Sequence, residues 1–307
     1  MTKLNLGPYR AGDAPGPASV PVSVVVLTRD EEANISRCLT SVGWADQVVV
    51  LDSGSADDTV PIARSLGAEI VQQPWLGFSG QRDFALRLPA LRHHWVYFVD
   101  ADQWVSPQLA AEIADRLRAP TCAAFAHRSR LVFQGTWIRH CGWYSNSWNV
   151  QLMDRRYAKY DGSLLGERVR VDGATQRLRN DVVDNDLKGL ASWLHKHIRY
   201  AQLETDRRGQ SPRLLARVRA VRDRDDVRPL FRAVLKDVIF PSVPAKPLSL
   251  FCYMYIARRG FLEGATGLRF CLFLSWYEIT VAALRSEKKA TEPAVAHSAA
   301  KRLDLQK

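Results

Sequence analysis

The chain has 307 residues, of which 47% are hydrophobic and 24% charged, a balance that fits a folded globular protein and excludes a disordered or fibrous one. Its formal net charge is +11, and residues 186–285 supply most of it, with 18 Lys and Arg against 9 Asp and Glu. A basic C-terminal third favours contact with an anionic membrane surface, a phosphorylated acceptor or nucleic acid, unless it is an ordinary solvated arginine-rich face.

Cysteine usage and the ends of the chain set further expectations. The five cysteines have neither zinc-site spacing nor the pattern of a disulfide framework, so free thiols in a reducing compartment are expected. Residues 1–21 lack the apolar stretch of a signal peptide and read as a flexible leader. Charged residues flank the apolar runs 248–257 and 270–277, so the sequence predicts no segment that spans a membrane.

The N-terminal half alternates apolar strands with helical patterns. Strands are expected at 22–27, 48–51, 68–71 and 95–99, with helices after the first two and another opening at Ser106-Pro107. Such alternation predicts a parallel sheet covered on both faces, with ligands bound beyond the carboxyl ends of the strands. The polar residues at those ends are Thr28, Asp52, Asp100 and Asp102.

After residue 120 the pattern changes. Residues 122–175 read as short strands and loops rich in Trp, Tyr and Arg, 185–205 as a helix, 209–228 as an arginine-rich stretch and 229–285 as an apolar region. The predicted organisation is a leader at 1–21, a domain at 22–205 with halves 22–119 and 120–205, a basic and apolar helical membrane-proximal region at 206–285, and a flexible tail at 286–307.

Two acidic motifs at strand ends could carry chemistry. Asp100-Ala101-Asp102 follows five apolar residues, and carboxylate oxygens are the ligands that Mg²⁺ and Mn²⁺ favour. Asp52 begins Asp-Ser-Gly-Ser and could accept hydrogen bonds from a nucleoside. Each motif also has a purely structural interpretation, a turn at the end of a strand.

Four strings resemble glycosyltransferase family 2 in content, order and spacing: SVVVLTRDEEANISRCLTSV at 23–42, VVVLDSGSADDTVPIA at 48–63, GFSGQRDFAL at 77–86 and WVYFVDADQWVSPQL at 95–109. The continuation GTWIRHCGWYS at 135–145, with Gly166-Glu167 and the 185–205 helix, is most similar to the bacterial branch of lipopolysaccharide-core β-1,4-glucosyltransferase-like enzymes.

That resemblance implies an α/β GT-A (Rossmann-like) nucleotide-sugar-binding domain, followed here by a mostly helical, basic and apolar C-terminal extension. By position, Thr28, Glu31 and Asp52 would contact the nucleoside and Arg82 would lie near the diphosphate. Asp100 would approach the ribose or the metal, and Asp102 would ligate Mg²⁺ or Mn²⁺.

The catalytic base is assigned to Glu167, with Asp161 and Asp172 as alternatives. Asp161-Gly162 and Asp172-Gly173 read as turns, whereas Glu167 precedes the alternating run 168–171 and matches a glutamate of the resembled branch. The competing interpretation is a surface glutamate paired with a nearby arginine. Three aromatic residues could stack on sugar rings or belong to the core: Trp137, Trp143 and Tyr144.

The resemblance therefore implies an inverting, metal-dependent transfer from a nucleotide-diphosphate donor, foremost a UDP-sugar, to a hydroxyl of a glycolipid or polysaccharide such as lipopolysaccharide core. A polyprenyl-phosphate-linked or exopolysaccharide acceptor, or a degenerate non-catalytic binding protein, are the alternatives. A cytoplasmic location, peripheral on the inner face of the cell membrane, is expected, with no nucleic-acid partner. A nicotinamide-dependent enzyme is disfavoured because no glycine follows the first strand.

Overall fold

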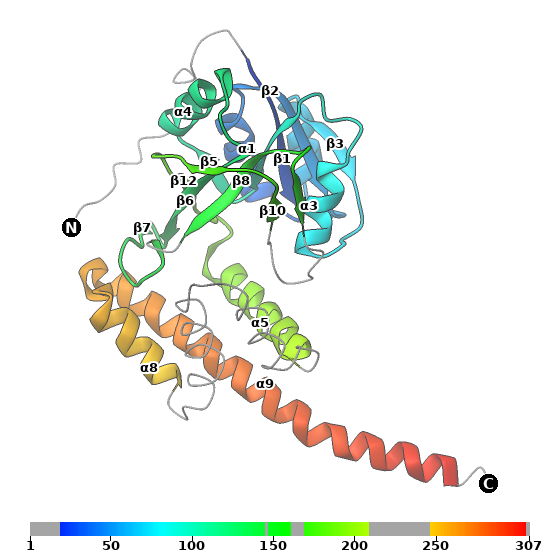
Figure 1. Cartoon of the computed structure of the whole chain (residues 1–307). Helices are drawn as coiled ribbons and strands as arrows, with labels where there is room; N and C mark the ends of the chain where they lie inside the picture. The colour runs from blue at the N-terminus through cyan, green and yellow to red at the C-terminus, as the bar shows by residue number, and fades with distance from the viewer. Residues whose placement is uncertain (1–18, 145–146, 161–168, 209–245, 305–307) are drawn as a thin grey trace. The chain divides into compact units, whose positions relative to one another are not determined.

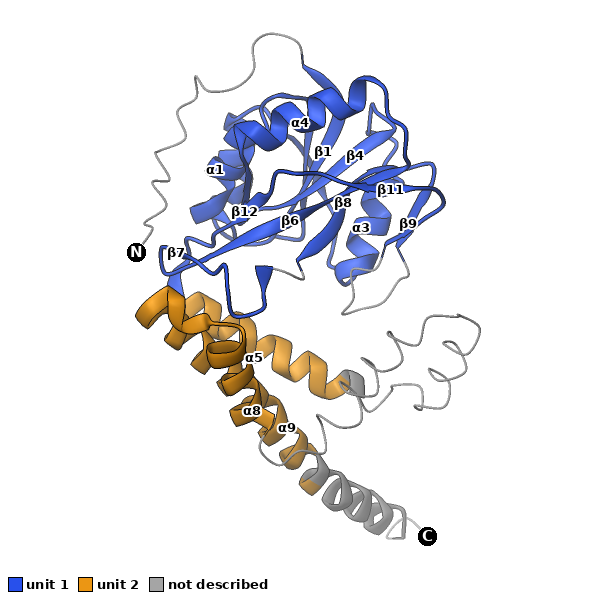
Figure 2. Ribbon diagram, turned by 60° about the vertical axis from the view of Figure 1, so that its left-hand side comes forward, with its two compact units in different colours: residues 1–190 blue, residues 191–307 orange. Residues whose placement is uncertain are grey.

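The computed structural model describes residues 19–144, 147–160, 169–208 and 246–304, and these fall into two compact units (Figure 2). The first unit ends at Leu190 and the second begins at Ala191. Residues 1–18 of the predicted leader lie outside the described residues, as does the arginine-rich stretch 209–228.

The first unit is built on a ten-stranded sheet in the order β3-β2-β1-β4-β8-β6-β12-β5, with β11 and β7 paired to β6 (Figure 1). Its strands are β1 (Val20–Thr28), β2 (Ala45–Asp52), β3 (Glu69–Gln72), β4 (Trp95–Asp100), β5 (Gln103–Val105), β6 (Ala124–Phe133), β7 (Thr136–Trp137), β8 (Trp148–Asp154), β11 (Thr175–Arg177) and β12 (Val182–Asp184). A separate two-stranded sheet consists of β9 (Ala158–Tyr160) and β10 (Val169–Val171). The helices packed with the ten-stranded sheet are α1 (Glu32–Ser41), α2 (Thr59–Ser65), α3 (Phe78–Leu86) and α4 (Pro107–Arg118).

The N-terminal half is the predicted parallel sheet. Strand β1 pairs in parallel with β2 and β4, and β2 pairs in parallel with β3. The third strand begins one residue later than expected, at Glu69. The second half is mixed, because β8 runs antiparallel to both β4 and β6, while β12 is parallel to β6. Strand β6 therefore runs in the same direction as β4.

Both faces of the sheet are covered, as the continuous apolar strands require. Val24 and Val26 of β1 pack with residues of α1 and α4, whereas Val25 between them packs in a second cluster with Ala85 of α3. Successive strand residues point to opposite faces, so a run such as VSVVVL supplies two cores at once. The start of α4 is fixed locally, since the Ser106 hydroxyl caps the Leu109 N–H at 3.2 Å.

A fully buried polar pair lies inside this sheet. His127 of β6 has its Nε2 3.1 Å from the Tyr97 hydroxyl of β4, and its Nδ1 3.3 Å from the carbonyl oxygen of Arg128. The neutral imidazole satisfies both contacts, with Nδ1–H donating and Nε2 accepting. Burial lowers the pKa of His127 from its ordinary 6.5 to about 4.

We expect acid to destabilise the protein through this histidine. Above pH 6.5 both the folded and the unfolded chain hold it neutral; below 6.5 the unfolded chain binds the proton first. Between pH 6.5 and 4 the fold should lose up to about 3 kcal/mol from this group. Thermal unfolding of wild type and His127→Gln at pH 7.5 and about 4.5 measures it, with exposed His195→Gln as control. An equal loss of stability in wild type and His127→Gln would contradict the assignment.

The second unit is helical. It comprises most of α5 (Gly189–Arg208), then α8 (Lys246–Cys252), the π-helix η4 (Tyr253–Ala257), the 3₁₀ turn η5 (Gly260–Glu263) and α9 (Gly264–Asp304). Helix α5 packs against α9, where the Tyr277 hydroxyl donates to Glu204 at 2.8 Å and Trp193 meets Phe273 with ring centroids 5.6 Å apart. The predicted boundary at residue 205 assigned this helix to the first domain, whereas the structure groups it with the C-terminal helices.

The length and composition of helix α9 differ from the expectation that no segment of the chain could span a membrane. The stretch Gly260–Lys288 is long and apolar enough to cross one by length and composition, with an 18-residue window of mean hydropathy 1.3 that is 28% buried. Arg269 and Glu278 interrupt the apolar composition but not the helix. The helix also continues to Asp304, through most of the residues predicted as a tail.

Candidate functional site

The carboxyl ends of three neighbouring parallel strands bring the predicted polar residues to one edge. Thr28 at the end of β1 is in register with Asp52 at the end of β2, and Leu27 is in register with Asp100 of β4. This is the edge at which open α/β sheets bind ligands. The structure therefore places Thr28, Asp52 and Asp100 on adjacent strands, as the sequence predicted.

Asp52 organises the loop that follows it. Its side chain is fully buried and accepts hydrogen bonds from the backbone N–H groups of Gly54 and Ser55, each at 3.0 Å, from the Thr28 hydroxyl at 3.2 Å and from the Ser55 hydroxyl. Gly54 has φ of 85°, which favours glycine. Four donors occupy this carboxylate, so the structural interpretation of the motif, a strand-end turn, is what the geometry shows.

The loop after β1 is joined to the loop after β2. Asp30, with φ of 53°, donates its N–H to the Ser55 hydroxyl at 2.9 Å and accepts the Ala56 N–H on Oδ1 at 2.8 Å. Glu31 donates its N–H to the Thr59 hydroxyl at 2.7 Å. These bonds make the two loops one surface at the sheet edge.

Glu31 is a half-buried carboxylate held by two donors. Lys188 Nζ lies 2.6 Å from its Oε1 and Asn34 Nδ2 lies 2.9 Å from its Oε2. Burial raises the pKa of Glu31, the bonds from Asn34 and Lys188 oppose that rise, and the charge of Asp102 adds to it. The carboxylates of Glu31 and Asp102 are therefore close enough to repel each other, and a cation bound beside them would offset this repulsion.

Lys188 belongs to a segment that the sequence analysis missed. Residues 185–188 follow β12 at the same sheet edge: Asn185 donates its N–H to the carbonyl oxygen of Asp102 at 3.0 Å, and Asp186 accepts from the buried Asn34 at 2.9 Å. The helix predicted from 185 begins instead at Gly189, because residues 185–188 are engaged with this edge. The sequence does carry a pattern that indicates the end of strand β12, since two valines followed by Asp184 repeat the strand-end pattern of Asp52 and Asp100.

Arg82 reaches the edge from the buried face of α3. Its guanidinium is 3% exposed, lies 2.7 Å from Asp100 Oδ1 and stacks over Phe98 at 5.8 Å. Its neighbour Gln81, fully buried, donates to the Ser53 hydroxyl at 3.0 Å and so ties α3 to the loop after β2. Arg82 thus compensates the charge of Asp100, and Gln81 is a second residue that sequence reasoning missed.

Asp100 and Asp102 offer oxygen ligands of the type that a hard divalent cation takes. Arg82 holds Oδ1 of Asp100, whose side chain is 37% exposed, and Asp102 is half-buried on the turn after β4. Within the described ranges, no group of three or more His, Cys, Asp or Glu side chains is arranged to hold a metal. Two carboxylates fit a Mg²⁺ or Mn²⁺ ion whose remaining ligands are substrate phosphates and water.

Of the three residues considered as the catalytic base, Asp172 lies among the described residues. Glu167 and Asp161 fall outside the described residues. Asp172 lies in the bend after β10, where its N–H donates to the Tyr157 carbonyl oxygen at 2.8 Å, as its turn pattern predicted. Strand β10 confirms the alternating run that follows Glu167.

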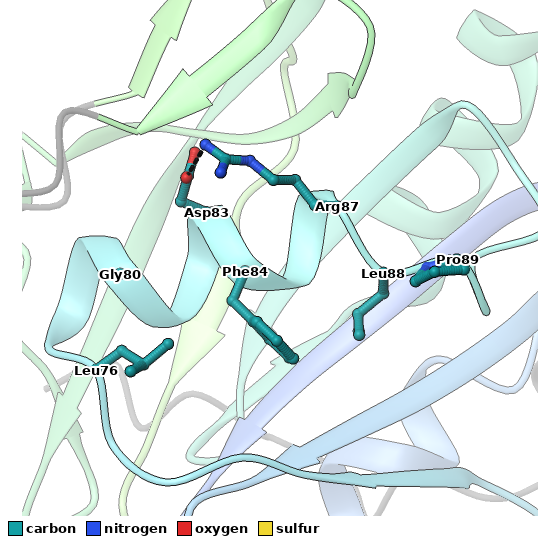
Figure 3. Close-up of a pocket in the computed structure, with 7 residues that line it drawn as sticks. All are labelled: Leu76, Gly80, Asp83, Phe84, Arg87, Leu88 and Pro89. Carbon is teal, nitrogen blue, oxygen red and sulfur yellow. Dashed lines mark hydrogen bonds and ion pairs between the residues drawn. The ribbon is translucent and has the colours of Figure 1, made fainter.

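A cavity of about 320 Å³ lies elsewhere, on the outer face of α3 (Figure 3). Gly80, Asp83, Phe84 and Arg87 recur at helical spacing along it, and Asp83 pairs with Arg87. Arg82 lies on the buried face of the same helix and does not line this cavity. The cavity is therefore separate from the edge that holds Asp100.

Comparison with known proteins gives this arrangement a family. A sequence model described as Glycosyl transferase family 2 matches residues 23–177, about half of the chain. An uncharacterized glycosyltransferase of Rickettsia typhi is 43% identical over 93 residues, which cover 30% of this chain and 31% of that protein. The lipopolysaccharide core biosynthesis glycosyltransferase LpsC of Rhizobium meliloti is 29% identical over 105 residues, with 38% of that protein covered. The matches to these relatives thus span about a third of their length.

Two solved structures are similar over comparable stretches. TarS of S. aureus, in complex with UDP-GlcNAc, is 24% identical with a TM-score of 0.33, over 37% of this chain and 35% of that one. Glucosyl-3-phosphoglycerate synthase of Mycobacterium tuberculosis, in complex with Mn²⁺, UDP and its product, is 26% identical with a TM-score of 0.31, over 36% and 44%.

Proposed function

The chain belongs to glycosyltransferase family 2 and has its α/β GT-A fold, and from that premise we propose that it transfers a sugar, with inversion, from a nucleotide-diphosphate donor to a hydroxyl of a glycolipid or polysaccharide. The observation that carries the proposal is the sheet edge where the joined loops after β1 and β2, Arg82 and the Asp100–Asp102 turn come together. A UDP-sugar is the donor that we propose first.

The donor site is proposed as follows. Thr28, Glu31 and Asp52 form the nucleoside end, with Asp52 acting through the loop backbone that it orders. Arg82 lies beside the diphosphate, and Asp102, with the free oxygen of Asp100, holds Mg²⁺ or Mn²⁺. A bound divalent cation supplies Lewis-acid stabilisation of the leaving diphosphate. The Arg82 guanidinium adds fixed positive charge in a buried position, where it needs little reorganisation.

The acceptor hydroxyl needs a base, because it is a poor nucleophile at neutral pH. We assign the base to Glu167, which would take the hydroxyl proton as the oxygen attacks the anomeric carbon and the bond to the diphosphate breaks. A single displacement of this kind inverts the anomeric centre. Lipopolysaccharide core is the proposed acceptor, supported by the likeness to LpsC. A polyprenyl-phosphate-linked or exopolysaccharide acceptor is the alternative.

A thermal-shift screen of nucleotide sugars with and without Mn²⁺ tests the donor half. We expect UDP-sugars to raise the melting temperature in the presence of Mn²⁺ and much less in its absence. Product formation with the same donor then separates an enzyme from a non-catalytic binding protein, which would bind without turnover. If no nucleotide sugar stabilises the chain with the metal present, the proposed function is wrong.

We also propose that the protein is cytoplasmic and rests on the inner face of the cell membrane. The second unit exposes large apolar side chains, among them Leu248 at 64% and Ile256 at 61%. Beside them in sequence lies the basic stretch of Arg213, Arg217, Arg224, Arg228, Arg232 and Lys236. Co-sedimentation with anionic but not neutral vesicles, weakened by salt, is the expected outcome. Equal recovery in both supernatants would refute it.

A further inference from the structure

The first unit carries a cluster of arginine and aromatic side chains that the donor site does not use. Arg128 of β6 lies over two rings, 4.3 Å from the centroid of Tyr144 and 5.1 Å from that of Trp148. Arg177 of β11 covers the Trp148 ring at 4.6 Å. Arg130, farther along β6, and Arg139, after β7, lie over Trp137 at 5.2 and 5.5 Å. Trp137 and Tyr144 meet edge to face at 5.3 Å, so the two groups are continuous.

One buried carboxylate anchors the cluster. Asp181 lies 2.9 Å from Arg130 Nε and 3.4 Å from Arg128 Nε, and it accepts the Tyr144 hydroxyl at 2.7 Å. Its side chain is 2% exposed, so the two guanidiniums are held by a fixed counter-charge. Burial, followed by the bond to Asp181, raises the pKa of Tyr144, which keeps its hydroxyl a donor. The cluster is thus preorganised around one buried carboxylate.

Positive charge exceeds negative charge in this cluster. Four guanidiniums face one carboxylate, and among the described residues no other carboxylate lies within salt-bridge distance of them. Asp181 engages the Nε atoms of Arg128 and Arg130, which leaves their terminal nitrogens without a protein acceptor in the described part of the chain. Arg139 and Arg177 are exposed. Guanidiniums held against rings keep N–H groups available for phosphate or carboxylate oxygens.

The sheet places this cluster beside the donor edge. Strand β6 runs parallel to β4, so residues beyond Arg128 approach the same edge as Asp100. Arg130 is in register with Val183 of β12, two residues before Asn185, whose N–H bonds to Asp102. A saccharide bound at Trp148 or Trp137 would therefore lie on the side of the sheet edge that holds Asp100.

We propose that the Arg128–Arg130–Arg139–Arg177 cluster, with Trp137, Tyr144 and Trp148, recognises an acceptor saccharide that carries an oxyanion, a phosphate or a carboxylate. The guanidiniums bind the anion, and the exposed parts of the half-buried aromatic side chains contact the sugar. The proposal rests on the proposed glycosyl transfer for its biological role, but the binding itself requires neither donor nor turnover. It restricts the acceptors to charged sugars and disfavours neutral polysaccharide.

Calorimetric titration of the full chain with four small probes at constant ionic strength tests this. Glucose 6-phosphate and glucuronate carry both a sugar and an oxyanion; glucose lacks the anion, and glycerol 3-phosphate lacks the ring. We expect saturable binding of at least one of the first two, about ten-fold or more tighter than either glucose or glycerol 3-phosphate. Which of the two binds distinguishes phosphate from carboxylate.

The variant for this test is the double substitution Arg139→Gln with Arg177→Gln, because both side chains are exposed and neither bonds Asp181. It should weaken binding of the charged sugar about ten-fold or more. Arg118→Gln on α4, 81% exposed, is the matched control and should not change it. Equal binding of glycerol 3-phosphate, binding of glucose alone, no binding of any probe, or an unaffected double variant would each overturn the proposal.

Thermal shift with UDP and Mn²⁺ on the same samples separates this proposal from the proposed function. Charged-sugar binding without a response to UDP or to any nucleotide sugar of the donor screen would leave the cluster assigned and refute the transfer. A response to UDP without charged-sugar binding would refute the charged-sugar site and leave the proposed transfer standing.

Discussion

Asp102→Ala is expected to abolish sugar transfer and to remove the Mn²⁺-dependent stabilisation that UDP gives the wild type. Charge stabilisation by a bound cation is worth several kcal/mol, and each 1.4 kcal/mol is tenfold, so turnover should fall by about 10³-fold or more. The fold should survive, because Asp102 is half-buried on a turn and its carbonyl oxygen still accepts the Asn185 N–H. Initial rates and melting temperatures with UDP, with and without Mn²⁺, are the measurements.

The matched control is Asp115→Ala, which removes a carboxylate that is 76% exposed on α4. It should change neither quantity. Wild-type turnover that is unaffected by a chelator would show that no metal is needed. Metal-dependent stabilisation that persists in Asp102→Ala would move the ligand role to Asp100 or Glu31.

Glu167→Gln is expected to lower kcat by about 10²-fold or more while donor and metal binding stay at the wild-type level. Glutamine keeps the size of the side chain but cannot take the proton of the acceptor hydroxyl. The assignment rests on the position of Glu167 in the sequence, after Gly166 and just before β10, which pairs antiparallel with β9. Steady-state rates at saturating donor, together with the UDP and Mn²⁺ thermal shift, separate chemistry from binding.

Asp172→Asn is the companion variant, because Asp172 lies in the bend after β10 and contributes its backbone N–H to Tyr157. It should retain wild-type kcat. Near-normal kcat in Glu167→Gln, with a large loss in Asp172→Asn or Asp161→Asn, would reassign the base.

The N-terminal half of the fold was predictable because its strands are long, apolar and followed by helical periodicity. Runs such as VSVVVL and WVYFV are recognisable without any partner, and their polar ends fix the ligand edge. The short strands β5, β7, β11 and β12 were not predictable, because they are two or three residues long and are defined by pairing across the chain. Short strands carry too little periodicity to be distinguished from loops.

The site residues likewise divide into those that the sequence pattern reveals and those that only contacts in the folded chain reveal. Thr28, Asp52 and Asp100 were found because each ends a recognisable strand. Asn34, Gln81 and Lys188 were missed, because their importance comes from burial and from partners on other elements: Asn34 reaches Asp186, and Lys188 reaches Glu31. Helix α9 shows a different limit of the sequence pattern, since charges that interrupt its apolar composition do not interrupt the helix.

Strand β12 also has a consequence for how the polypeptide is made. It pairs with β6 and β5 at once, and the residues just after it reach Asp102 and Glu31, so it completes the sheet from far along the chain. During synthesis β5 and β6 leave the ribosome long before β12, and until then β6 lacks one partner and β5 lacks the strand with which it pairs in the sheet. Long-range pairing of this kind folds slowly and exposes strand edges to aggregation. The nascent protein should therefore depend on chaperones until residue 188 has emerged, and a chain stopped after Arg177, where the family match ends, should aggregate.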